Sequence, residues 1–135
     1  MHKKLSPASI SRNPNYSQGI ETAPGMRIVA VAGQTGRDAK GNVPEGMAAQ
    51  ADIAWRNVMT VLAEAGMGAE HIIHYTSNLV AGSDSKAYDA ARLKHLGAAR
   101  PASTKVYISG LAQPNMLCEV QAFAAAPAGA QEPIV

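Results

Sequence analysis

The chain has 135 residues, a formal net charge of +2 and one cysteine. This length fits a single domain, and the sequence holds no run of about 20 apolar residues that could span a bilayer. Scattered positive charges argue against nucleic acid, while the lone thiol and the absence of a hydrophobic signal segment lead us to expect a soluble cytoplasmic protein without an internal disulfide.

The first predicted strand covers Arg27 to Ala32. Small and β-branched apolar residues occupy both of its faces, so we expect both faces to be buried. The following segment, residues 33–42, is rich in turn-forming residues and predicts a loop or a wide hairpin connection. This loop leads through Pro44 before any helical pattern begins, which argues against a phosphate-binding loop.

Two helices and three further strands are predicted downstream. Apolar residues at helical spacing predict a helix from Met47 to Ala65, ended by Gly66. Asp84 is expected to cap a second helix over residues 85–96. Strands are predicted at residues 71–80, 104–108 and 116–124, because these segments are short and rich in β-branched and apolar residues.

This order of elements predicts an α+β domain over residues 1–126 with both helices on one face of a sheet. The Ala/Pro/Gly-rich segment 127–135 is expected to be a flexible tail. Aromatic residues make up only 4% of the chain, so small aliphatic side chains must fill the core, which favours close helix–sheet packing or burial shared between subunits.

Four short motifs occur in an order that resembles the YjgF/Rid family of enamine/imine deaminases, which includes proteins described as endoribonuclease L-PSP. They are Tyr16-Ser17-Gln18, Ala32-Gly33-Gln34, Pro101-Ala102 and Leu117-Cys118-Glu119-Val120. The resemblance implies a chorismate-mutase-like sheet, three subunits forming a barrel, and small-molecule sites in the clefts between subunits. It implies no cofactor.

The resemblance also assigns site residues. Glu119 matches the late-strand glutamate that positions water or handles a proton, although a solvent-facing carboxylate is the alternative reading of its sequence context. Tyr16 matches an aromatic residue that lines the cleft, and Gly33 matches a glycine that lets the ligand approach the backbone, while a simple turn glycine is an equally good local explanation. Asp89 stands where the family has an asparagine, and an exposed helix face would explain it without any ligand.

One position departs from the family in a way that affects substrate binding. Ser103 stands where the deaminases carry the arginine that grips a substrate carboxylate. Losing one partner of such an ion pair typically costs ~2–5 kcal/mol. Lys105, which has the same strand parity as Ser103, and Arg100 are the nearby cations. The substrate is therefore expected either to lack this carboxylate or to be bound without turnover.

Other constellations carry little chemistry. His71 and His74 are three residues apart in a predicted strand, so their side chains should point to opposite faces and no metal site is expected. Cys118 has apolar neighbours and reads as a buried, inert thiol. The sequence thus predicts an imine or enamine hydrolase with an altered substrate or, as the alternative, a non-catalytic trimer that binds a small metabolite; ribonuclease activity is the least favoured reading.

Overall fold

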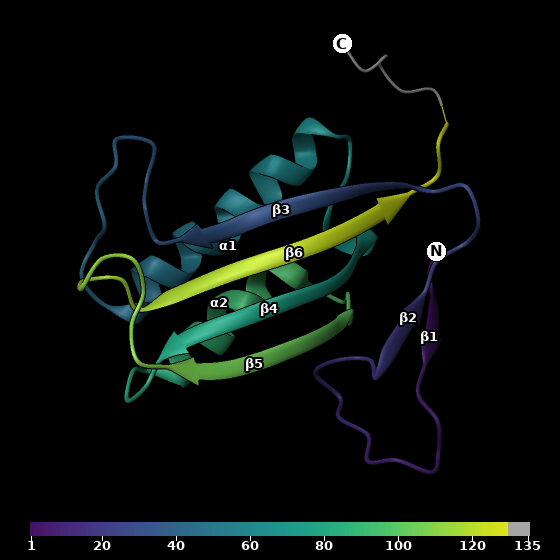
Figure 1. Ribbon diagram of the computed structural model, residues 1–135, viewed down its shortest axis with the longest axis horizontal. Coiled ribbons are helices and arrows are strands. Elements are labelled where there is room, and N and C mark those ends of the chain that lie inside the picture. Colours follow the sequence, from purple (N-terminus) through teal and green to yellow (C-terminus); the bar gives the residue numbers. More distant parts are fainter. Residues whose placement is uncertain (130–135) are drawn as a thin grey trace.

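The computed structural model describes residues 1–129 and shows a mixed four-stranded sheet with two α-helices on one face (Figure 1). A two-stranded ribbon stands beside this sheet. The elements in chain order are β1 (Lys3–Leu5), β2 (Gly19–Glu21), β3 (Arg27–Thr35), α1 (Met47–Glu64), the 3₁₀-helix η1 (Ala69–His71), β4 (Ile72–Val80), α2 (Ser85–Leu96), β5 (Ala102–Ile108) and β6 (Cys118–Ala126). The expected α+β class is confirmed.

The sheet has the strand order β3-β6-β4-β5. The last strand in the sequence, β6, lies in the interior and pairs antiparallel with both β3 and β4, while β4 pairs parallel with β5. Consequently β3 and β5 form the two outer edges of the sheet, a placement that decides where the candidate site residues lie.

The core lies between the helices and the sheet. The inner face of α1 presents apolar residues at spacings of three and four, and all of them are fully buried: Ala51, Ala54, Trp55, Val58 and Leu62. Trp55 packs edge-on against Tyr75 of β4, with ring centroids 5.0 Å apart. Alanines of β6 occupy the opposing surface, and their small side chains let the helix approach the sheet closely.

A buried glutamine connects α1 to two loops. The side-chain amide of Gln50 donates to the carbonyl oxygens of Pro44 and Asn115, both at 2.9 Å, and its Oε1 accepts from the backbone N–H of Leu117 at 2.8 Å. Both polar atoms of this buried side chain are therefore satisfied, by three hydrogen bonds in all. These bonds hold the chain immediately before β6 and so fix where that strand begins.

The other face of the sheet is uncovered in the single chain, which contradicts the expectation that both faces of the first strand are buried. Val31 is buried under the helices, but Ile28 is 67% exposed on the opposite side of β3. Phe123 of β6 and Val106 of β5 are 38% and 39% exposed. The prediction was wrong for the isolated chain because residues 1–129 contain only two α-helices and both lie on the same face.

The strand and helix boundaries follow the predicted ones with local differences. β3 continues to Thr35 through a register shift between Val31 and Gln34, so part of the predicted loop is strand. Short β1 and β2 were not predicted. The tail expected to be flexible lies mostly outside the described residues. Within residues 1–129, no helix has the length and hydrophobicity needed to cross a membrane.

Candidate functional site

A cavity of about 440 Å³ opens beside the edge strand β5, a size typical of small-molecule sites. It lies between β5, the α2 helix and the segment that precedes β2. Its lining contains three of the predicted site residues; the full set is Asn13, Asn15, Tyr16, Tyr75, Ser77, Asp89, Arg92, Ser103, Thr104 and Lys105. We refer to it as the β5 cavity.

The β5 strand supplies Ser103 and Lys105 to this cavity. In the parallel ladder, Ser103 lies opposite Tyr75 and Lys105 lies opposite Ser77, and both partners face the helix layer. Side chains two residues apart on a strand share a face. The predicted common orientation of Ser103 and Lys105 is thus confirmed.

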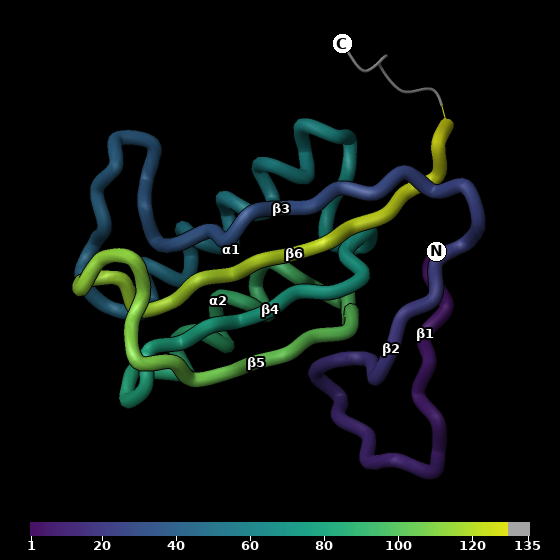
Figure 2. Tube along the Cα trace, in the orientation of Figure 1, coloured from purple at the N-terminus to yellow at the C-terminus, as the bar shows by residue number. Residues whose placement is uncertain are grey.

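The N-terminal segment brings Tyr16 to the same place. Figure 2 shows this segment passing beside the start of β5. The N–H of Ser17 donates to the Pro101 carbonyl oxygen at 3.2 Å, and the Ser17 hydroxyl donates to the Arg100 carbonyl oxygen at 2.5 Å. Since Ser17 is buried and anchored at two points, the adjacent Tyr16 is held at the mouth of the β5 cavity.

The α2 helix contributes one acidic and one basic side chain. Asp84 caps the helix by accepting from the N–H of Ala87 at 3.1 Å, as predicted. One turn and a half further on, Asp89 accepts from Lys105 Nζ with both carboxylate oxygens, each at 3.1 Å. Asp89 is therefore a half-buried member of the cavity and not simply a solvated residue on an exposed helix face.

Arg92 is the charged cavity residue that the sequence analysis missed. It is only 7% exposed, its Nη1 donates to the Tyr75 hydroxyl at 3.3 Å, and its Nε lies 3.4 Å from Asp89 Oδ1. Its position three residues after Asp89 on the same helix was a signal that both side chains share a face. With Arg92 and Lys105 as cations and Asp89 as the single carboxylate, the lining carries one net positive charge.

The other two predicted residues, Gly33 and Glu119, meet on the opposite side of the sheet. Glu119 lies in β6 between buried Cys118 and Val120, so its half-buried side chain projects from the uncovered face. A Cβ built on Gly33 would lie 2.6 Å from Glu119 Cδ and 2.8 Å from Oε2. The glycine therefore leaves the space that the carboxyl group occupies. Asn78 Nδ2 approaches Glu119 Oε1 at 3.4 Å, at the long end of a hydrogen bond.

Within one chain, the structure divides the predicted residues into two groups. Tyr16, Asp89 and Ser103 line the β5 cavity, whereas Gly33 is on the opposite edge strand, β3, beside Glu119 of β6. Three strand steps separate β3 from β5, which amounts to roughly 14 Å. The single chain does not bring all five residues together.

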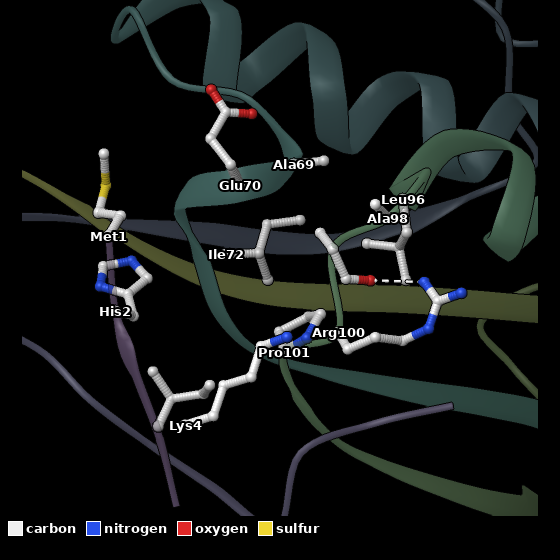
Figure 3. Close-up of a pocket in the computed structure, with 12 residues that line it drawn as sticks. Met1, His2, Lys4, Ala69, Glu70, Ile72, Leu96, Ala98, Arg100 and Pro101 are labelled. Carbon is white, nitrogen blue, oxygen red and sulfur yellow. Dashed lines mark hydrogen bonds between the residues drawn. The ribbon is translucent and has the colours of Figure 1, made fainter. Parts of the chain in front are cut away.

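A second cavity, of about 420 Å³, contains none of the predicted residues (Figure 3). Figure 3 shows Met1 and His2 on one side of it, Ile72 at its centre and Arg100 on the other side. The Arg100 guanidinium donates to the carbonyl oxygens of Gly97 and Ala99, both at 2.8 Å, and to that of Pro14 at 3.2 Å. Arg100 therefore holds the chain after α2 and does not enter the β5 cavity; of the two cations named from sequence, Lys105 does.

Two further polar groups beneath the sheet have no part in the candidate site chemistry. The cysteine is buried, as predicted, and burial raises the pKa of the Cys118 thiol to about 12, which favours its protonated form. Burial also raises the pKa of Tyr88, whose hydroxyl shares a short hydrogen bond with Ser77. Among residues 1–129, no three His, Cys, Asp or Glu side chains gather where they could hold a metal ion.

The fold and the β5 cavity define a small α+β protein with a ligand-sized pocket at a sheet edge. The chain belongs to the endoribonuclease L-PSP family, also known as the YjgF/Rid family, whose sequence profile matches residues 6–126. No curated protein matches the chain.

Three solved structures illustrate the similarity. A Rid-family protein of unknown function from Yersinia pestis is 22% identical, with a TM-score of 0.81 and coverage of 93% of this chain and 98% of that one. A candidate endoribonuclease L-PSP from Entamoeba histolytica is 26% identical, with a TM-score of 0.70 and coverage of 90% and 94%. RidA from an Antarctic Psychrobacter species is 22% identical, with a TM-score of 0.69 and coverage of 90% and 94%. At these identities, the structures support the fold.

Proposed function

We propose that this protein hydrolyses the C=N bond of a small imine or enamine, with Glu119 as the residue that activates water. The observation that carries the proposal is the contact between Glu119 and Gly33, which gives the carboxylate a fixed place on the uncovered face of the sheet. Only one protein donor, Asn78, approaches the carboxylate there among the described residues. Glu119 therefore has acceptor capacity left for a water molecule.

In the proposed reaction, Glu119 accepts a proton from water as the oxygen bonds to the imine carbon. The C=N electron pair moves to nitrogen, which takes up a proton and gives a carbinolamine. In the collapse of this intermediate, the nitrogen gains the proton held by Glu119, the hydroxyl loses its proton to solvent, and the C–N bond breaks as the C=O bond forms. The products are therefore a carbonyl compound and ammonia. The chemistry requires no change of oxidation state and no cofactor, and a positioned carboxylate typically contributes ~10²–10⁴-fold to such proton transfers.

We further propose that the protein assembles as a homotrimer with a chorismate-mutase-like barrel. The two groups of site residues lie near opposite edges of the sheet, so the β3 side of one copy and the β5 side of the next can complete a site between them. Such head-to-tail contacts form a ring when the rotation between neighbouring subunits closes, as a three-fold rotation does. The uncovered apolar residues Ile28, Val106 and Phe123 would be buried in that assembly. A reducing cytoplasm suits its single buried thiol.

The test is a turnover assay on a panel of imines and enamines with the wild type and the Glu119→Gln variant. Glu119→Gln keeps the side-chain shape but removes the base, so we expect turnover to fall by roughly 10²–10⁴-fold with little change in ligand affinity. Gln121→Ala is the matched comparison, because Gln121 is the next outward residue of β6. A Glu119→Gln variant with the wild-type rate, or a loss confined to Gln121→Ala, would refute the assignment of Glu119.

A trimer that binds a metabolite without turnover is the second candidate. The observation that favours it is that Ser103 replaces the family arginine while Asp89 is already paired with Lys105. In this case no imine, enamine or amide should turn over, and Glu119→Gln should change affinity alone. Ribonuclease activity is the weakest alternative, because the β5 cavity carries one net positive charge and the sequence shows no basic stripe or aromatic stacking surface.

A further inference from the structure

We infer that Arg92 is the specificity-determining residue of the β5 cavity and that it binds a ligand carboxylate attached through an arm of carbon atoms, not directly at the reacting C=N carbon. This inference rests on the proposed function, since it takes the β5 cavity to be the substrate site. In the family, the residue that binds the carboxylate is an arginine at the position of Ser103 on β5. Here we assign carboxylate binding to Arg92 on α2 instead.

The burial and the contacts of Arg92 support this role. Its side chain is 8% exposed, and its guanidinium is oriented by the Tyr75 hydroxyl through Nη1 and by Asp89 through Nε. Neither bond uses Nη2. A guanidinium fixed by neighbouring groups loses little freedom when it binds an anion, and its planar fork suits a carboxylate.

The charge of the lining favours a singly charged anion. Asp89 lies between the two cations and accepts from Lys105 with both oxygens, so Lys105 is largely neutralised. The one net positive charge of the cavity balances a carboxylate better than a phosphate, which carries nearly two negative charges at neutral pH.

The depth of Arg92 determines the length of the ligand. Ser103 lies on β5 itself, where its short side chain leaves the space that a longer residue would fill. Arg92 lies behind it in the helix layer, against Tyr75, which is 2% exposed. A carboxylate bonded directly to the reacting carbon would stop near Ser103, whereas one on a two-carbon arm can extend across that space toward Arg92.

The test is calorimetric binding of product-like compounds to the full-length protein. The probes are 4-oxopentanoate, with its carboxylate two carbons from the carbonyl-bearing carbon; 2-oxobutyrate, with adjacent groups; neutral pentan-2-one; and inorganic phosphate. We expect 4-oxopentanoate to bind at least 10-fold tighter than each of the other three. Equal or tighter binding of 2-oxobutyrate or pentan-2-one would overturn the inference, and tighter binding of phosphate would overturn the carboxylate assignment.

The variants then assign the effect to Arg92. Arg92→Met should weaken 4-oxopentanoate binding by at least 10-fold, since truncating one partner of a buried charge pair has effects of that size or larger. Arg92→Lys should retain part of the affinity, and Lys86→Met, which removes an exposed charge from the same helix, should have no effect. Wild-type affinity in Arg92→Met would defeat the inference. If Arg92→Met does not fold, the order of ligand affinities for the wild type still tests the inference.

The binding test is also independent of the proposed reaction, because binding is measured without turnover. Tight binding of 4-oxopentanoate with no hydrolysis of any imine would refute the proposed reaction and leave this inference standing.

Discussion

Glu119 occupies the space that Gly33 leaves by having no side chain, with a built Cβ at Gly33 falling 2.6 Å from the Glu119 carboxyl carbon. The two residues lie on neighbouring strands, β3 and β6, close to the register shift between Val31 and Gln34. Gly33 does not have a positive φ, so its backbone conformation does not require glycine. Glycine is needed at this position because a side chain would collide with the Glu119 carboxyl group.

Gly33→Ala should consequently impair function more than folding. The added methyl group must displace the flexible end of Glu119, and we expect turnover to fall by roughly 10²-fold, toward the loss expected from removing the base. Stability should change by no more than about 1 kcal/mol, because the backbone conformation suits alanine. Steady-state kinetics and thermal unfolding measure the two effects. Gly110→Ala, at an open position, is the control, and equal activity in both variants would contradict the role of this contact.

Light scattering should give a mass three times that of the 14.0 kDa chain. Ile28→Asp should lower this mass at micromolar concentration, because it places a charge on the apolar face that the assembly would bury. Val61→Asp is the control, since Val61 is 39% exposed on the helix layer and should leave assembly unchanged. A monomeric mass for the wild type would refute both the proposed trimer and the proposed site between subunits.

Ser103→Arg alone should not produce robust hydrolysis of 2-iminobutyrate. The wild type should be weak on this substrate because Ser103 cannot hold a carboxylate next to the imine carbon. In the variant, the new guanidinium should pair with Asp89, which lines the same β5 cavity as Ser103. Replacing Asp89 with asparagine in the same protein removes this competitor, so the double variant should exceed the single variant in kcat/KM. Strong turnover of 2-iminobutyrate by the wild type would refute the prediction.

A charged contact between the helices should make stability fall in acid. Asp52 of α1 accepts from His95 Nε2 at 2.8 Å and from Lys94 Nζ at 3.0 Å, both on α2. These two hydrogen bonds, with smaller Coulombic contributions from Lys94 and Arg56, hold the pKa of Asp52 below its ordinary value of 3.8. Since the folded-state pKa is the lower one, the stabilisation is complete above the unfolded-state pKa and is lost as pH falls through the folded-state pKa.

Urea unfolding of the wild type and Asp52→Asn at fixed protein concentration measures this contribution. At pH 6 we expect the variant to be less stable by about 1 kcal/mol, and the difference should shrink as the pH is lowered toward 2.5. Glu64→Gln, which changes an exposed carboxylate on the same helix, should show a smaller difference at pH 6. A difference for Asp52→Asn that stays constant with pH would show that its carboxylate charge does not stabilise the fold.

The helices were predictable because their signals are local. The period of apolar residues and the stop at Gly66 defined α1 to within one residue, and the Asp84 cap defined the start of α2. The ribbon formed by β1 and β2 escaped prediction because each strand has only three residues, and β1 is largely polar and fully exposed. The uncovered face of β3 could not be recognised from the strand alone, since a strand buried in an assembly has the same apolar pattern as one buried within a chain.

Site residues that match family motifs could be predicted from the sequence. Residues whose place in the site depends on tertiary packing could not. Tyr16, Asp89 and Ser103 were expected at one site and line one cavity. Arg92 looks like an ordinary helix-surface cation in the sequence, and its burial follows only from the way α2 packs against Tyr75. The division between the β3 and β5 sides also depends on strand order, which the sequence pattern does not determine.

Gly33 and Ser103 lie on opposite edge strands. In the proposed ring, subunits that carry different substitutions should therefore be able to complement each other, which a pocket within one chain does not allow. A subunit carrying Glu119→Gln and another carrying Arg92→Met each lack one half of every site in their own homotrimers. In mixed trimers, an intact β3 side meets an intact β5 side at one interface in each ring. The two impaired proteins, unfolded together and refolded as a mixture, should therefore show more activity than either possesses alone.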